Sequence, residues 1–188
     1  MTPADGSVGS GVDDAERLRF PIGRFRPRVG LSADERGALI ADIAALPADL
    51  RAAVSDLSPD QLDAPYRPDG WTVRQVVHHV PDSHLNSYVR FKLAVTADEP
   101  LIEAYDQAAW AELPDGRGDD IETSLVLLEA LHRRWTAFLR ALDGASYDRA
   151  YRHSERGRVT LEDNLQLYAW HGRHHLAHVT ELRRRMGW

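Results

Sequence analysis

The chain has 188 residues, of which 43% are hydrophobic and 28% are charged, values typical of a single folded globular domain. Its formal net charge of −6 argues against nucleic acid or an anionic membrane surface as a partner. The absence of cysteine excludes disulfides, thiolate catalysis and cysteine-bound metals, and it fits a reducing cytoplasm, where we expect the protein to act.

The N-terminal residues 1–19 are rich in Gly, Ser and Asp and lack the apolar stretch of a secretory signal, so we predict a flexible tail. The single domain is expected to occupy residues 20–188. The segment FPIGRFRPRVG (20–30) contains Pro21, Gly23 and Pro27, which predict an extended path over the surface.

Ser32 and Glu35 form a capping box, and apolar residues follow at helical spacing as far as Leu57, with Pro47 expected to kink or divide this helix. The sequence SPDQL (58–62) predicts one short helical turn. A second capping box, Thr72 to Gln75, begins a helix predicted to reach about residue 95.

Pro81 lies inside this second helix, where it predicts a local bend. Residues 96–120 read as a long connection with one short helix at about 107–112. A third long helix is predicted at 121–142, a hairpin at 146–159, and a last helix from Thr160 to Met186. Four long amphipathic helices with irregular connecting loops predict an all-α fold, a four-helix bundle.

Four of the nine histidines lie in WHGRHHLAH (170–178). Residues four apart share one helix face, so His171 can converge with His175, and His174 with His178. Two imidazoles at this spacing can bind one metal ion, but the glutamate of the H-E-x-x-H motif is missing. A pH-sensitive patch or a solvated helix face would also place histidines in this pattern.

A third ligand could come from HHVPDSH (78–84) in the second helix. His79 begins a polar stripe there, whereas His78 is placed nearer the packing edge. A second polar stripe runs along the last helix, and two such stripes can meet inside a bundle and form a metal site. The stripes consist of His79, Asp82, Ser83, Asn86 and Arg90, and of Asn164, Tyr168, His171, His175 and His178.

Polar residues near the ligands could orient them through their second ring nitrogen, as at many metal sites. Asp82, Asp163 and Asn164 are the candidates for this role. The isolated His132 and His153 are expected to be surface or locally bonded residues.

Long stretches of the chain resemble the YfiT group of the DinB-like superfamily. The resemblance covers the chain from Pro21 to Trp188 and is carried by GWTVRQVVHHVPDSHLNSYVRFKLAVT, YDQAAWAELPD, LLEALHRRWTAFL and LYAWHGRHHLAHVTELRRRMGW. It implies a four-helix bundle, a homodimer, and a divalent ion held by three histidines. By the family motif these are His79, His171 and His175. Zinc and nickel both suit three histidine ligands, and we expect one such ion per chain.

The resemblance also implies two reactions. Some relatives transfer low-molecular-weight thiols of the bacillithiol or mycothiol type to an electrophilic small molecule, which suggests a metal-bound thiolate as nucleophile. The alternative is a metal-dependent hydrolase with a metal-bound hydroxide. Asp82 and His178 are the candidate catalytic residues. A non-enzymatic metal-binding dimer is a third possibility, and we favour the thiol S-transferase because no internal cysteine competes with the incoming thiol.

Overall fold

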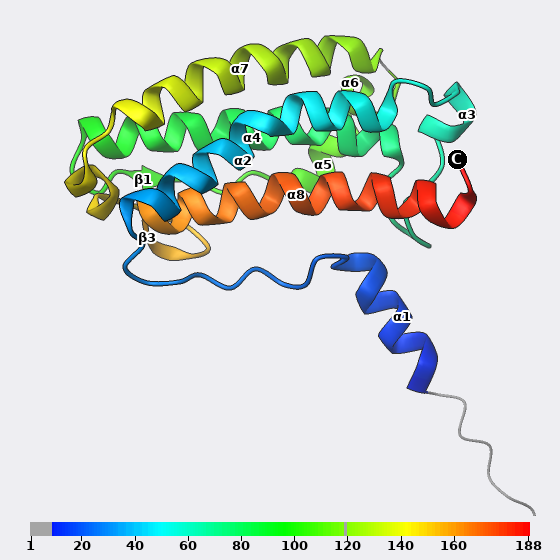
Figure 1. The fold of residues 1–188 in the computed structure, drawn as a ribbon, viewed down its shortest axis with the longest axis horizontal. Helices are drawn as coiled ribbons and strands as arrows, with labels where there is room; N and C mark the ends of the chain where they lie inside the picture. Colours follow the sequence, from blue (N-terminus) through cyan, green and yellow to red (C-terminus); the bar gives the residue numbers. More distant parts are fainter. Residues whose placement is uncertain (1–8, 119) are drawn as a thin grey trace, which may run out of the picture.

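Four helices of 21 to 26 residues build the protein, as the sequence predicts: α2 (Ala33–Val54), α4 (Val73–Thr96), α7 (Ile121–Ala141) and α8 (Leu161–Met186). The computed structural model describes residues 9–118 and 120–188. Helix α2 packs against α7 and α8, and α4 packs against the same two helices, so α2 and α4 occupy opposite corners of the bundle (Figure 1). None of the described helices combines the length and the hydropathy needed to cross a membrane.

The helix starts are fixed by side chains that accept hydrogen bonds from the first free backbone N–H groups. Ser32 and Thr72 form complete capping boxes with Glu35 and Gln75. The last helix begins after Thr160, and it ends at Gly187, whose φ of 71° lies in the left-handed region that glycine adopts readily.

The two internal prolines do not divide their helices. Pro47 lies inside α2 and Pro81 inside α4, and both are buried. A proline in a helix costs about 3 kcal/mol through the lost hydrogen bond and the clash of its ring. In α2 the buried neighbours Ile43, Leu46 and Leu50 pack into the bundle on both sides of Pro47, which offsets this cost.

A small sheet closes one end of the bundle. Strands β2 (Ala150–His153) and β3 (Gly157–Thr160) form the predicted hairpin, and β1 (Leu101–Ile102) adds to β2 in parallel. The short helix α5 (Gln107–Ala111) was expected, whereas α6 (Pro114–Arg117), the 3-10 helix η1 (Gly144–Asp148) and strand β1 were not. The turn after α2 is α3 (Pro59–Leu62), as SPDQL predicts.

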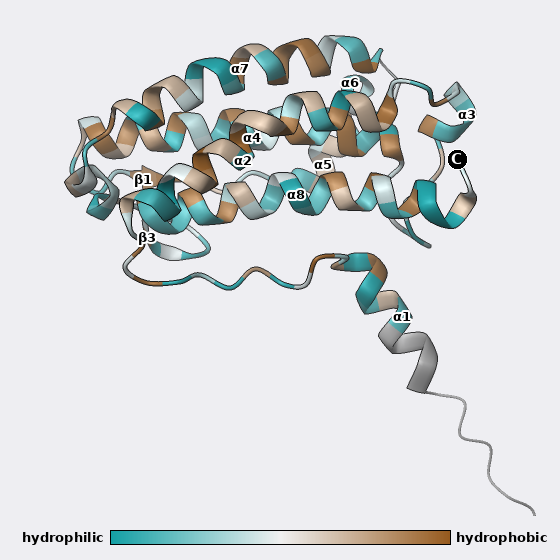
Figure 2. Cartoon of the chain, in the orientation of Figure 1, coloured by the Kyte–Doolittle hydropathy of each residue, from teal (hydrophilic) through white to brown (hydrophobic). Residues whose placement is uncertain are grey.

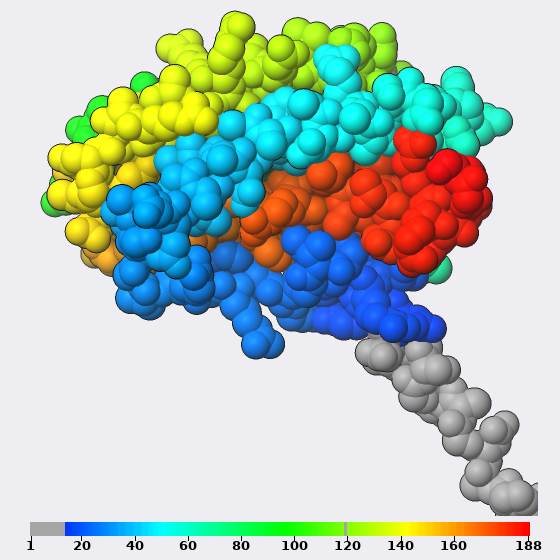
Figure 3. Space-filling model, in the orientation of Figure 1, coloured from blue at the N-terminus to red at the C-terminus, as the bar shows by residue number. Residues whose placement is uncertain are grey.

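The N-terminal region differs from the prediction. Residues Gly9–Arg19 form a helix, α1, where a flexible tail was expected, and residues 1–8 lie outside the described part of the chain. The segment that follows runs extended along α8, as predicted (Figures 1 and 3). It is held there by paired hydrogen bonds between the backbone of Arg28 and the Gln166 side chain, both 2.8 Å long.

The hydrophobic core consists of two clusters with a polar layer between them. One cluster contains Ile43, Phe91, Trp135 and Leu165, and the other contains Leu46, Val76, Leu128 and Val179. All four long helices alternate hydrophobic and hydrophilic patches along their length (Figure 2). The polar layer is made mainly of histidines, and it is where the site lies.

Candidate metal centre

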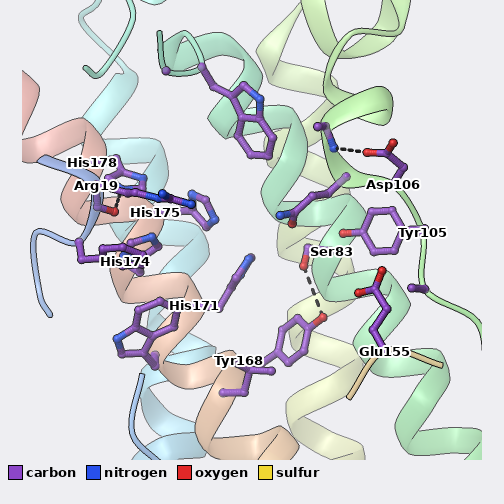
Figure 4. A pocket seen from close by; sticks show the side chains of 18 of the residues that line it. Arg19, Ser83, Tyr105, Asp106, Glu155, Tyr168, His171, His174, His175 and His178 are labelled. Carbon is purple, nitrogen blue, oxygen red and sulfur yellow. Dashed lines mark hydrogen bonds between the residues drawn. The ribbon is translucent and has the colours of Figure 1, made fainter. Parts of the chain in front are cut away.

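A cavity of about 950 Å³ opens beside this histidine layer. Its walls come from α4, from α8, and from the segments around residues 66–71, 104–108 and 153–156. Figure 4 shows His171, His174, His175 and His178 along one helix, with Ser83 and Tyr105 on the other side. Helices α4 and α8 run in opposite directions, so the first turns of α4 face the later turns of α8 (Figure 1).

The structure brings together the three histidines that the sequence singled out. One ligand atom from each of His79, His171 and His175 lies within 4.8 Å of the other two. The Nε2 atoms of His79 and His171 are 3.3 Å apart. A tetrahedral ion with metal–nitrogen bonds of about 2.0–2.1 Å separates its ligands by roughly 3.3–3.4 Å, so this pair already has the right spacing.

The third histidine is also free to bind. Within the described residues, neither ring nitrogen of His175 has a hydrogen-bond partner, and its Nδ1 is buried. Trp71 lies against two of the rings, with centroid distances of 4.7 Å to His79 and 6.4 Å to His175. The His79–His171 pair therefore fits a divalent ion in spacing, and all three histidines fit it in ligand type.

The protonation state of the three rings suits metal binding. Burial lowers the pKa of His79 to about 4, with a smaller contribution from the charge of His178. Burial and the neighbouring imidazoles hold the pKa values of His171 and His175 well below their usual range. All three rings are thus neutral at pH 7, the state in which imidazole binds a metal.

A chain of buried imidazoles fixes the tautomer of His171. His132 Nδ1 lies 2.6 Å from the carbonyl oxygen of Ile43, which can only accept, so this nitrogen carries the proton. The Nε2 atom of neutral His132 then accepts from Nδ1 of His84 at 2.9 Å. His84 Nε2 in turn accepts from Nδ1 of His171 at 3.1 Å, which leaves the Nε2 lone pair of His171 facing His79.

This chain corrects two sequence-based expectations. His132 is not a surface residue, since only 1% of it is exposed. The expected orienting residues also differ: Asn164 bonds Tyr151 and Ser87, and Asp163 bonds Thr160 at the start of α8. The orienting contact comes instead from an imidazole, because Nδ1 of His171 donates its hydrogen bond to Nε2 of His84.

The other isolated histidine, His153, is buried rather than exposed, but it is locally bonded as expected. Its Nδ1 accepts a hydrogen bond from the backbone of Glu155 at 3.2 Å. His78 is also buried, and its Nδ1 lies 2.7 Å from the Ser124 hydroxyl of α7. His78 therefore links α4 to α7 and is not part of the three-histidine group.

The remaining histidines of WHGRHHLAH lie on the cavity wall but pack against aromatic rings. His174 stacks on Trp170 with a centroid distance of 4.4 Å. His178 stacks on Tyr66 at 3.9 Å and donates from Nε2 to the Arg19 carbonyl at 3.1 Å, which leaves its buried Nδ1 without a described partner. The candidate catalytic residue His178 thus lies in the cavity with one ring nitrogen already used.

The second candidate catalytic residue, Asp82, does not line the cavity. Burial raises its pKa to about 6, and the nearby Asp115 contributes to the shift. Its neighbour Ser83 does line the cavity and donates to the Tyr168 hydroxyl at 3.4 Å (Figure 4). A one-residue step along a helix turns the side chain by about 100°, which explains why only Ser83 faces the cavity.

Comparisons with known proteins agree with this architecture. The model of the DinB superfamily matches residues 42–179. A protein of Bacillus subtilis named as a candidate metal-dependent hydrolase, YfiT, is 49% identical over 172 residues, which cover 91% of this chain and 97% of that protein. A relative from Bacillus cereus (strain 03BB102), named in the same way, is 48% identical over 171 residues, 91% of this chain and 98% of that one.

The solved structure of YfiT from Bacillus subtilis, described as "a probable metal-dependent hydrolase with an unusual four-helix bundle topology", matches with a TM-score of 0.90 and 49% identity. The match covers 92% of this chain and 99% of that structure. Sequence and structure therefore agree along nearly the whole chain, which belongs to the DinB superfamily.

Proposed function

We propose that the chain is a metal-dependent enzyme in which His79, His171 and His175 hold one divalent ion, zinc or nickel. We further propose that it transfers a low-molecular-weight thiol of the bacillithiol type to an electrophilic small molecule. The observation that carries the proposal is the convergence of three neutral imidazoles at the wall of a cavity of about 950 Å³. When bound, the ion would act as a Lewis acid and lower the pKa of a coordinated thiol or water molecule.

The residues of the chain position the reactants. Three imidazoles leave room for an exogenous ligand, since structural zinc sites use four protein ligands and catalytic sites three. The cavity reaches the size range of small-molecule sites and can accommodate both a thiol and its acceptor. This open cavity also favours an enzyme over the alternative of a sealed, non-enzymatic metal-binding dimer.

The transfer needs no reactant other than the thiol and the electrophile. The thiol sulfur forms a bond to the electrophilic carbon while the bond from that carbon to its leaving group breaks. The leaving group departs with the electron pair, and the proton of the thiol passes to solvent. The chain itself has no cysteine that could react with the electrophile in place of the incoming thiol.

A thiol-panel assay tests the proposal. Protein loaded with zinc or nickel and metal-stripped protein would be mixed with monochlorobimane and each of several thiols, including bacillithiol. We expect conjugation, with release of chloride, that depends on the bound metal and is lost in His175→Ala. Conjugation at the same rate with metal-stripped protein would contradict the role of the ion.

The second candidate is a metal-dependent hydrolase, and the names of the relatives favour it. Water in place of the thiol would attack an ester or amide carbonyl. Asp82 and His178 are the candidate proton acceptors, although Asp82 does not line the cavity. If no thiol is conjugated but p-nitrophenyl esters or amides are cleaved only by the metal-loaded protein, the hydrolase hypothesis replaces the transferase hypothesis.

A further inference from the structure

One buried arginine lines the cavity and has no role in the proposed transfer reaction. Arg90 lies on α4 and lines the same cavity as the three histidines, although only 6% of the residue is exposed. It follows His79 by eleven residues, which is three helical turns on the same face and about 16 Å along the axis. The cavity therefore extends from the histidines at one end towards a guanidinium at the other.

Arg90 lacks the ionic partner that other shielded arginines of this chain have. Arg36 pairs with Glu162 at 3.1 Å, and Arg183 pairs with Asp56 at 2.6 Å. Within the described residues, no carboxylate lies within 4.0 Å of Arg90, and its Nε is buried without a hydrogen-bond partner. Its Nη1 makes a long hydrogen bond, 3.5 Å to the Tyr168 hydroxyl, and its guanidinium also interacts with the hydroxyl of Tyr151; both partners are uncharged.

Such an arrangement is energetically unfavourable unless an anion is bound beside the guanidinium. A buried charge without a partner costs several kcal/mol, and a guanidinium cannot relieve this cost by losing its proton. Arginine presents five N–H donors in a planar fork that matches a carboxylate or phosphate group. An anion in the cavity would supply the missing charge and the missing acceptors.

The surroundings of Arg90 also favour an anion. The cavity is lined by the four arginines Arg19, Arg67, Arg90 and Arg156 and by the three carboxylates Asp69, Asp106 and Glu155, in a chain whose net charge is −6. Tyr105 also lines it, and burial raises the pKa of this phenol to about 12, so its hydroxyl remains a donor at neutral pH. The cavity wall thus carries one more positive than negative side chain, although the molecule as a whole is acidic.

We propose that Arg90 forms an anion-binding subsite that holds a carboxylate or phosphate group of the small molecule whose reactive end reaches the three histidines. The substrate class is therefore an anionic small molecule, long enough to span from the guanidinium to the histidines. This inference deepens the proposed function and rests on it for the reactive end, but the subsite itself is defined without a metal.

Binding of simple anions to metal-free and metal-loaded protein tests the subsite. Inorganic phosphate, succinate and the uncharged analogue succinamide would be titrated at constant ionic strength, with calorimetry and thermal unfolding as readouts. We expect phosphate or succinate, but not succinamide, to bind the wild type and raise its Tm in the metal-free form. Comparing phosphate with succinate shows which oxyanion the fork prefers.

Three variants assign the binding to Arg90. Arg90→Met should weaken anion binding at least tenfold, and Arg90→Lys, which keeps the charge without the fork, should weaken it less. Arg134→Met removes an exposed arginine of α7 that does not line the cavity, and it should bind like the wild type. Without anion, Arg90→Met should unfold at a Tm equal to or above that of the wild type, because an unpaired buried charge has been removed.

Two results would overturn the inference: anion binding that is unchanged in both Arg90→Met and Arg90→Lys, or no anion binding by the wild type. A lower Tm for anion-free Arg90→Met would contradict the unpaired charge on which the inference rests. The metal-free titrations involve neither the ion nor a thiol. Failure of the thiol-conjugation assay would therefore leave these results standing, and failure here would leave the assignment of the metal site standing.

Discussion

The buried histidines divide into two kinds according to what their ring nitrogens contact. His79, His171 and His175 turn at least one nitrogen towards a shared point, whereas His84 and His132 use both nitrogens within the protein. Because the Ile43 carbonyl can only accept, the direction of every hydrogen bond in the second group is fixed. The backbone of α2 thereby orients a side chain of α8 through two intervening rings.

Removing His132 should loosen this orientation. His132→Phe keeps a ring in the core but takes away the acceptor for His84, so His171 can adopt either tautomer. We expect metal affinity to fall about 10- to 100-fold, the range seen when orienting groups behind metal ligands are lost. Nitrogen NMR of metal-free protein should show His171 protonated at Nδ1 in the wild type and a mixture of tautomers in the variant.

His78→Gln is the matched control, since His78 is a buried histidine that contacts Ser124 of α7 instead of the three-histidine group. It should leave both the tautomer and the metal affinity unchanged. If His132→Phe gives the wild-type tautomer and affinity, the imidazole chain has no part in orienting the centre.

At the scale of the helices, the close approach of α8 to α2 sets the position of the centre. Gly172 lies between His171 and His175, and a Cβ placed there would lie 2.5 Å from Cδ2 of Leu46. Leu46 is buried, so it has little room to move away. Glycine at this position therefore lets the two helix backbones come close enough to enclose the site.

Gly172→Ala should reveal this constraint when compared with Gly37→Ala. Gly37 lies inside α2 with open space around it, so alanine there should raise the free energy of unfolding by about 1 kcal/mol through helix propensity. At Gly172 the same gain in helix propensity is opposed by an overpacking cost of about 1–3 kcal/mol, so we expect Gly172→Ala to lower the free energy of unfolding. Urea denaturation of the two variants measures the difference, and equal stabilisation by both would show that α2 and α8 are not tightly packed there.

The helices and the shared face of His171 and His175 could be predicted because their signals are local, whereas the choice of His79 as the third ligand rested on the family motif. Ser32 and Thr72 each mark the start of a helix through a capping box that spans four residues. His171 and His175 share a face through helix geometry alone. The role of His132 could not be predicted, since its partners lie 48 and 89 residues away on other helices. Strand β1 has only two residues, too few to show a periodicity.

At the scale of the whole molecule, a layer of neutral histidines makes stability depend on pH. Burial lowers the pKa values of His79, His132 and His178 to about 4 from 6.5. Below pH 6.5 these histidines therefore become protonated in the unfolded chain, whereas in the folded protein they stay neutral down to about pH 4. The contribution of the neutral histidines to the free energy of unfolding is fully present above pH 6.5. It decreases as the pH falls from 6.5 to about 4 and changes no further below that.

We accordingly expect metal-free protein to be markedly less stable at pH 5 than at pH 7.5. His79 alone should lower the free energy of unfolding by about 2 kcal/mol at pH 5. Urea denaturation at a series of pH values measures the effect, and His79→Ala should reduce the slope between pH 6.5 and 5. A free energy of unfolding that does not change over this range would contradict the neutral histidine layer.

The homodimer implied by the family resemblance stays a prediction, as does the cytoplasmic location. Exposed apolar residues Leu85, Val89 and Leu93 recur every four residues on α4, and they form a strip that a second copy could cover. Light scattering should give twice the mass of the chain for the wild type and a smaller value for Val89→Glu. A monomeric wild type would refute the predicted dimer.

The central claim is that His79, His171 and His175 together hold one divalent ion per chain, and metal content tests it most directly. Zinc- or nickel-loaded protein would be dialysed and analysed for bound metal, with thermal unfolding as a check that each variant is folded. We predict about one ion per chain for the wild type and for His153→Ala, a cavity histidine outside the group, and less than about a tenth of that for His79→Ala and His175→Ala. Unchanged metal content in His175→Ala would contradict the account.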